Sequence, residues 1–344
     1  MAPKSIFSSL VREADGTWST AYNSFNLKSA LQPIFRRTSS GPLDIDSFEG
    51  LVRPHRNGEP VTPGEFFSLV APEDIENIDS ILRTIHILNT GRLSRSRARI
   101  FVNFHPGLFQ TPAKMRQEVE RMRLAAHEAG MTADRIVCEI SEKKASDTQM
   151  VADFAYHMHD IGFRVALDDY GAGDTAIERV KLIKPDYVKF EAGWVRDFMQ
   201  NSAGAALLRV IVSQFREDGI EPVFEGLETG WQVEQCEELG VFLMQGYILA
   251  KPELAPTSFD ARFPELGSAY FSPAARLEKG SAAFSVRSAP LTRIPCARPG
   301  HSENAASEAN SGSKTPPPQY CRNKCRGTPE FGLQAVHFEA SFVL

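Results

Sequence analysis

Short apolar runs alternate with amphipathic stretches along the first 264 residues, and most of the apolar runs end at a polar side chain. Apolar runs of this length are typical of buried strands, whereas apolar positions three and four residues apart are typical of helices. The runs predict strands at residues 29–35, 47–52, 99–104, 136–140, 163–167, 187–190, 222–225 and 241–247. Helices are expected at 65–70, 73–88, 112–129, 147–160, 205–215 and 231–239.

Strands that alternate with helices over this length predict an α/β fold, a TIM-like (β/α)8 barrel. The first connection is too short for a crossover helix, so the first strand is expected to pair antiparallel with the second. The predicted organisation is a short N-terminal leader at 1–28, the barrel at 29–264 and a low-complexity tail at 265–344. The tail is rich in Ser, Ala, Pro and Gly, and we expect it to be disordered because such a composition buries little apolar surface.

The charge of the chain is uneven. Of its 38 basic and 43 acidic residues, 9 and 6 lie between Glu265 and the C-terminus, which leaves 29 basic and 37 acidic residues in the body. An acidic body argues against electrostatic binding to duplex nucleic acid and is compatible with carboxylates gathered around metal ions.

The five cysteines, Cys138, Cys236, Cys296, Cys321 and Cys325, have no spacing typical of a zinc site or a disulfide framework. A reducing cytoplasm is therefore the expected location. No apolar stretch has the length of a signal peptide or of a membrane span, so we expect no contact with a membrane.

Candidate chemistry begins at Val165–Gly173, where an apolar strand runs into Asp168 and Asp169 and then into a glycine-rich turn. Adjacent carboxylates in a poorly solvated place repel each other, so a cation usually compensates them. A divalent metal ion is the simplest candidate, because hard cations prefer oxygen ligands. Taken alone, the segment is more typical of a solvated turn rich in Asp and Gly than of a metal site.

The remaining strands favour the metal-site interpretation. Barrel active sites are built at the C-terminal ends of several strands, which meet at one mouth. Each predicted strand contributes one polar residue at or near its end: Gln32, Glu49, Asn103, Glu139, Asp168, Lys189, Glu225 and Gln245.

At these positions the chain resembles the EAL-domain cyclic di-GMP phosphodiesterases. The resemblance covers about residues 29–255 and depends on short motifs in the family's order. The motifs are Gln32–Ile34, Glu49–Arg53, Val102–Phe104, Glu139–Glu142, Asp168–Gly171, Val188–Glu191, Glu225–Glu228 and Gln245–Tyr247 with Lys251–Pro252.

The resemblance implies hydrolysis of cyclic di-GMP to linear pGpG with two Mg2+ or Mn2+ ions. One ion would be held by Glu49, Asn103, Glu139 and Asp168. The second would be held by Asp168 as a bridge together with Asp169 and Glu225. Lys189 would contact the attacking water or the phosphate, and Gln245 would help to place the water. Gln32 and Arg53 would contact the substrate, and Glu142 and Glu228 would orient loops, although an ordinary loop salt bridge explains the last two nearly as well.

The chain departs from the family pattern at three places, one of which is the conservative replacement of aspartate by Glu191. Gly50 replaces the alanine of the signature, and Gly173–Ala176 replaces a loop that usually contains an aromatic residue and serines. The alternatives are a receptor that binds cyclic di-GMP without cutting it, and a barrel that only carries the long tail. The sequence does not reveal the oligomeric state, although members of the family often form homodimers through the barrel.

Overall fold

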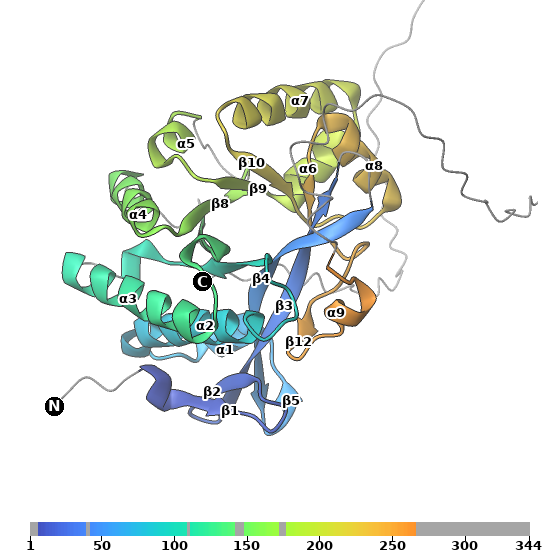
Figure 1. The fold of residues 1–344 in the computed structure, drawn as a ribbon. Coiled ribbons are helices and arrows are strands. Elements are labelled where there is room, and N and C mark those ends of the chain that lie inside the picture. The colour runs from blue at the N-terminus through green and yellow to red at the C-terminus, as the bar shows by residue number, and fades with distance from the viewer. Residues whose placement is uncertain (1–5, 39–41, 109–110, 142–147, 172–176, 266–344) are drawn as a thin grey trace, which may run out of the picture. The chain divides into compact units, whose positions relative to one another are not determined.

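The computed structural model describes residues 6–38, 42–108, 111–141, 148–171 and 177–265. In this part of the chain, eight strands close into a ring through the pairing of the first with the second and with the last (Figure 1). In ring order they are β3 (Phe25–Arg37), β4 (Leu43–Arg56), β6 (Arg99–Asn103), β7 (Ile136–Ser141), β8 (Arg164–Tyr170), β9 (Tyr187–Phe190), β10 (Glu221–Phe224) and β11 (Leu243–Met244). Strand β3 runs antiparallel to both β4 and β11, and the other neighbours are parallel. The predicted TIM-like barrel with an antiparallel first strand is confirmed.

Helices lie around the outside of the strands (Figure 1). They are α1 (Pro63–Ser68), α2 (Ile75–Thr90), α3 (Pro112–Glu128), α4 (Thr148–Ile161), α5 (Ile177–Ile183), α6 (Ala192–Met199), α7 (Ser202–Glu217), α8 (Gly230–Leu239) and α9 (Phe259–Arg262). The described residues also form four 3-10 turns: η1 (Ile6–Ser9), η2 (Pro72–Asp74), η3 (Pro106–Leu108) and η4 (Ala133–Arg135). Helices α5, α6 and α9 were not predicted from the sequence.

The N-terminal segment contributes strands of its own. Strands β1 (Leu10–Arg12) and β2 (Trp18–Tyr22) form a hairpin, and β2 pairs with the first residues of β3. The leader predicted at 1–28 therefore contains sheet within its described residues, and β3 starts four residues earlier than expected. Two further short strands, β5 (Glu59–Pro60) and β12 (Glu253–Leu254), pair with β4 and β3.

The barrel interior is filled below the strand ends. A cluster of buried side chains comes from seven barrel strands: Ile34, Phe101, Val137, Ala166, Tyr187, Val223 and Leu243. On the parallel strands each of these residues precedes a predicted site residue by two positions. Because side chains alternate along a strand, the site residues face the same interior in the layer above. The apolar cluster is therefore the floor of the site.

The opposite end of the barrel is held by ion pairs around Asp46. Its carboxylate oxygens lie 2.6 Å from Arg36 Nε and 3.1 Å from Arg99 Nη1, and Arg36 Nη2 also lies 2.6 Å from Glu221 Oε2. Burial alone would raise the pKa of Asp46, but the two guanidinium groups outweigh it and hold that pKa below its ordinary value. The charges connect β3 and β4 with β6 and β10.

Replacing Asp46 with Asn should destabilise the protein by about 1.5–3 kcal/mol at pH 7, since it weakens hydrogen bonds to charged groups. The folded-state pKa of Asp46 is lowered, so its contribution is fully present above the unfolded value of about 3.9 and is lost as pH falls through the folded value. Urea denaturation should therefore show a gap between the two proteins at pH 7 that shrinks below about pH 4. A gap that does not depend on pH would contradict this account.

The described chain continues past the barrel into α9. Arg95 Nε lies 2.9 Å from Asp260 Oδ1, and Phe259 packs against Phe48 with 5.8 Å between ring centroids. The Glu265 carboxylate accepts hydrogen bonds from the Ser96 and Arg97 backbone amides. The tail predicted to be disordered lies, after residue 265, outside the described residues. Among the described helices, none combines the length and the apolar character that crossing a bilayer requires.

Candidate metal-dependent active site

Lys189 lies at the centre of the polar residues predicted at the strand ends, which are called the strand-end ring below. Its side chain on β9 is 1% exposed, yet its ammonium is surrounded by four carboxylates from four other strands or strand ends. The distances from Lys189 Nζ are 2.7 Å to Glu139, 3.1 Å to Glu225, 3.5 Å to Asp168 and 3.6 Å to Glu49. The structure thus brings together the predicted lysine and four of the predicted carboxylate ligands.

Burial and mutual repulsion dominate the electrostatics of this ring. Burial lowers the pKa of Lys189, but the four carboxylates outweigh it and hold the pKa well above its ordinary value, so the lysine is charged. Burial first, and then the neighbouring carboxylates, raise the pKa of Glu139, and the same causes raise the pKa of Glu225 to about 8. One ammonium therefore does not fully compensate this group of acids.

A β-bulge explains how two consecutive aspartates reach the same mouth. In a regular strand Asp168 and Asp169 would face opposite sides of the sheet. The register between β8 and β9 shifts from Leu167 opposite Val188 to Tyr170 opposite Phe190, so one extra residue is inserted there. Asp169 takes a left-handed conformation with φ of 60°, which aspartate tolerates better than most residues. The bulge re-aims Asp169 toward the interior.

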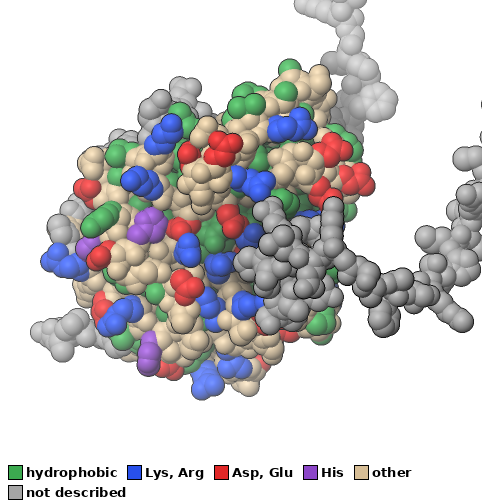
Figure 2. All heavy atoms as spheres, turned by 45° about the horizontal axis from the view of Figure 1, so that its top comes forward, with side chains coloured by type: hydrophobic (Ala, Val, Ile, Leu, Met, Phe, Trp, Pro, Cys, Tyr) green, Lys and Arg blue, Asp and Glu red, His purple; other side chains and the backbone are tan. Residues whose placement is uncertain are grey.

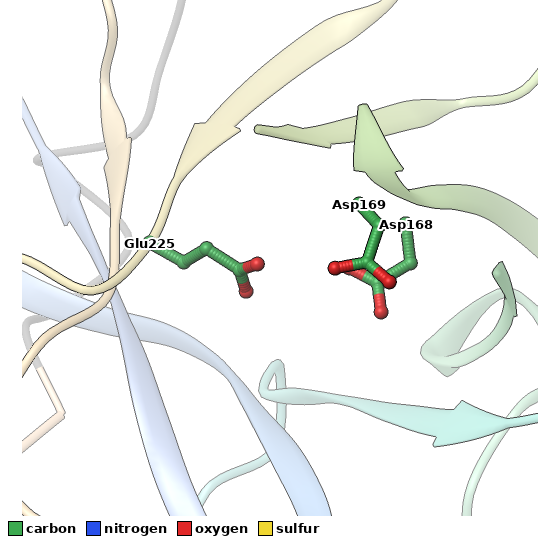
Figure 3. Close-up of side chains that lie close together, drawn as sticks. All are labelled: Asp168, Asp169 and Glu225. Atoms are coloured by element: carbon green, nitrogen blue, oxygen red, sulfur yellow. The ribbon is translucent and has the colours of Figure 1, made fainter. Parts of the chain in front are cut away.

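Three carboxylates form a group that could hold a metal ion. Asp168, Asp169 and Glu225 each offer an oxygen, and these oxygens lie within 4.8 Å of one another. In Figure 3, Glu225 extends from the end of β10 toward the aspartate pair on β8. The buried Oδ1 atom of Asp168 lies 3.5 Å from Lys189 Nζ but accepts no hydrogen bond from the described residues. Clustered carboxylates that include a buried oxygen without a hydrogen bond fit a hard divalent cation.

Gln245, just after β11, holds the Glu49 side chain of β4 through a hydrogen bond. Gln245 Nε2 donates to Glu49 Oε2 at 2.6 Å, and the backbone N–H of Gln245 donates to Phe224 O, which fixes the residue just after β11. The Oε1 atom of Gln245 is buried and has no hydrogen-bond partner among the described residues. That oxygen is available to accept a hydrogen bond from a water molecule in the site.

Asn103 is supported by residues that sequence reasoning missed. Its backbone carbonyl accepts a hydrogen bond from Arg83 Nη1 at 3.2 Å, and Asn103 lies opposite Glu139 in the register of β6 and β7. The fully buried Arg83 on α2 is paired with Asp79 and with Glu118. No local pattern reveals this network, because its members come from two helices and a strand end.

The other predicted site residues lie outside the central contacts. Gln32 is buried on β3, where Nε2 donates to Ala250 O at 3.4 Å. Arg53 is half-buried on β4 and donates to the Val52 carbonyl at 2.9 Å. The Glu228 side chain is exposed, and Glu142 lies outside the described residues. The substrate and loop roles of these four residues stay predictions.

The loop after Glu225 ends at a well-capped helix. Thr229 Oγ1 accepts from the Gln232 N–H, and the Gln232 side chain accepts from the Thr229 N–H, which together form a capping box for α8. Gln232 Oε1 also accepts from the Glu228 N–H at 2.7 Å. The cap therefore fixes the conformation of the chain that follows Glu225, a candidate metal ligand.

Replacing Thr229 with Ala should lower the free energy of unfolding by about 1 kcal/mol, because the Gln232 N–H loses its acceptor. Urea denaturation at neutral pH measures this loss. Thr229→Ser keeps the hydroxyl and is the matched control. An alanine variant as stable as the parent would show that the cap contributes nothing measurable.

The family model for the EAL domain matches residues 16–252. The chain belongs to the EAL domain family. The match includes the hairpin strand β2 and the whole described barrel up to Pro252, so it extends beyond the segment on which the sequence motifs lie.

Curated relatives of this EAL chain are larger proteins. The chain is 28% identical over 241 residues to "Probable cyclic di-GMP phosphodiesterase PdeA" of Escherichia coli strain K12, which covers 68% of this chain and 31% of that protein. It is 25% identical over 204 residues to "Cyclic di-GMP phosphodiesterase PdeF" of the same organism, covering 57% of this chain and 26% of the relative. The chain thus spans about a third or less of the length of these relatives.

Solved structures share the fold. The phosphodiesterase PaMucR in complex with c-di-GMP superposes with a TM-score of 0.58 at 23% identity, covering 67% of this chain and 93% of that chain. Klebsiella pneumoniae BlrP1 in complex with calcium and cyclic di-GMP superposes with the same TM-score of 0.58 at 25% identity, covering 66% of this chain and 56% of that chain. The described EAL fold is therefore that of proteins solved with a cyclic dinucleotide bound.

Proposed function

We propose that this EAL chain is a cyclic di-GMP phosphodiesterase that uses two Mg2+ or Mn2+ ions and releases linear pGpG. The observation that carries the proposal is the buried ring in which Lys189 and four carboxylates converge at the C-terminal ends of the barrel strands. The curated relatives named as cyclic di-GMP phosphodiesterases support the choice of substrate.

The candidate ligands form two sets, which share Asp168 and suit two ions. Glu49, Asn103, Glu139 and Asp168 would hold one ion, and Asp168, Asp169 and Glu225 would hold the other. Bound ions of this kind supply positive charge for the phosphodiester and a water acidic enough to attack near neutral pH.

The chain's own residues supply the rest of the chemistry. Lys189 presents a fixed positive charge at the floor of the mouth, where it stabilises negative charge that develops on the phosphate during attack. Gln245 Oε1 can accept a hydrogen bond from the attacking water, while its Nε2 holds Glu49 in place. The apolar cluster beneath, which includes Phe101 and Tyr187, closes the barrel below the site and strengthens these interactions by excluding solvent.

The face shown in Figure 2 carries Lys and Arg side chains interspersed with Asp and Glu side chains. Lys and Arg side chains on a face would help an anionic substrate to approach it. Arg53, on the strand that carries Glu49, is the predicted contact for a substrate phosphate.

The test is to incubate the purified chain with cyclic di-GMP and Mg2+ or Mn2+ and to separate the nucleotides by chromatography. Metal-dependent appearance of pGpG, abolished by a chelator and by Glu49→Ala, is the expected result. Binding of cyclic di-GMP by calorimetry without any product would replace this proposal with the receptor alternative. Neither binding nor product would leave a barrel that serves as a scaffold.

A further inference from the structure

The outer face of β4 directly behind Glu49 is in contact with α2. Gly50 alternates with Glu49 along the strand, so a side chain at position 50 would point out of the barrel toward that helix. A Cβ built on Gly50 would lie 2.6 Å from His86 Cγ and 2.7 Å from His86 Cβ. Carbon atoms do not approach this closely without displacement of one partner.

His86 cannot easily yield that space. Its Cβ is attached to the backbone of α2, a helix of 16 residues whose last 13 positions are buried. Its imidazole Nδ1 lies 2.8 Å from Ser29 Oγ on β3, and the residue is 4% exposed. Burial, followed by the charges of Arg53 and Arg83, lowers the pKa of His86 to about 3, so the ring is neutral and substituting it removes no charge. An added methyl group would have to push the helix and the strand apart.

We propose that Gly50 and His86 form a matched pair that sets the distance between α2 and β4, and that His86 is thereby a positioning residue for Glu49. The imidazole occupies the space that the signature alanine would need, and it connects α2 to β3 through Ser29. Glu49 lies between this support on the outside and the Gln245 hydrogen bond on the inside.

The pair changes the meaning of the altered signature. A glycine inside a strand usually weakens that strand, so Gly50 considered alone would suggest a site that has lost its activity. Here the missing methyl group is matched by a large side chain from a neighbouring helix, so the two residues belong together. In this chain the signature alanine is therefore expected to be harmful unless His86 is also reduced in size.

The test is a double-mutant cycle with Gly50→Ala, His86→Ala and the combination of both. Gly50→Ala should lower Tm by roughly 3–10 °C, because overpacking of a closed core is destabilising. The double variant should melt above Gly50→Ala. Gly230→Ala is the matched control, since a Cβ at Gly230 meets open space and its Tm should stay close to that of the parent.

The role for Glu49 rests on the proposed function and needs a second readout. Mn2+ binding by calorimetry should show about 10-fold weaker affinity for Gly50→Ala, with most of the loss recovered in the double variant. If the parent binds no Mn2+, the proposed function and the positioning role both fail, whereas the melting cycle still decides whether the two residues are matched.

Other outcomes are equally decisive. A Gly50→Ala protein with the parent's Tm and Mn2+ affinity would overturn the proposal. So would a double variant no better than Gly50→Ala on either measure. If Gly50→Ala gives no folded protein, recovery of folded protein in the double variant is the expected result, and no recovery counts against the pair.

Discussion

Lys189→Met is expected to lower kcat for cyclic di-GMP by about 10²–10³ while the barrel still folds in the presence of Mn2+. The substitution keeps most of the aliphatic stem and removes the charge that lies within 3.6 Å of four carboxylates. Loss of one preorganised charge of this kind typically lowers kcat by about 10²–10³. The assay is chromatographic measurement of pGpG at saturating substrate and metal.

Lys189→Met should also change the stability of the protein, and the response of its Tm to metal shows whether the lost charge is the cause. Without metal, removal of Lys189 leaves buried carboxylates uncompensated and should cost about 3–5 kcal/mol in the free energy of unfolding. Added Mn2+ should raise the Tm of the variant more than it raises that of the parent, because the ion replaces the missing charge. The exposed Lys181→Met is the control and should change neither property. Parent-like turnover by Lys189→Met would exclude the proposed role of the lysine.

The sequence predicted the barrel well because its central strands are short, apolar and each ended by a polar residue. Tyr187–Phe190 and Ile136–Ser141 illustrate this, since their observed bounds differ little from the predicted ones. Helices α5 and α6, of seven and eight residues, were missed because so short a stretch shows little of a helical period, although the six-residue α1 was predicted.

The extended hairpins at the N-terminus carried signals that the strand prediction did not use. Asn57 and Gly58 both have positive φ at the turn between β4 and β5, and Asn-Gly is a strong hairpin sequence. Asp15–Gly16 lies in the longer loop between β1 and β2, where Gly16 has positive φ. These turns extend the sheet beyond the barrel, so the first two barrel strands are longer than the apolar pattern implied.

The site itself was only partly predictable. Strand-end position and the resemblance supplied the candidate residues, several of which the structure brings together around Lys189, but neither contains the bulge that turns Asp169 inward. The Arg83 support for Asn103 and the contact between His86 and Gly50 are also beyond sequence reasoning, because α2 meets these strands only in the folded barrel. The sequence alone does not give the register between strands or the packing between segments that lie far apart along the chain.

Asp169→Asn tests the bulge and the ion that it is proposed to serve. Asparagine has the same shape and also tolerates the left-handed conformation that Asp169 adopts at φ of 60°, so the backbone should be unchanged. The variant lacks the negative charge that completes the group with Asp168 and Glu225. We expect kcat to fall by about 10²–10⁴, the range attributed to groups that act directly on the reacting centre.

Measurements of Mn2+ binding and of Tm distinguish a metal-binding role of Asp169 from a purely structural role. Mn2+ titration of Asp169→Asn should show the loss or marked weakening of one binding event, while the Tm without metal should not fall, since removing a charge from an acidic cluster relieves repulsion. Asp169→Ala is the informative contrast: it removes the same ligand but places alanine in a left-handed backbone, so it should lose activity and also stability. An Asp169→Asn protein that binds two Mn2+ ions as tightly as the parent and still turns over would show that the bulge serves the fold and not the metal.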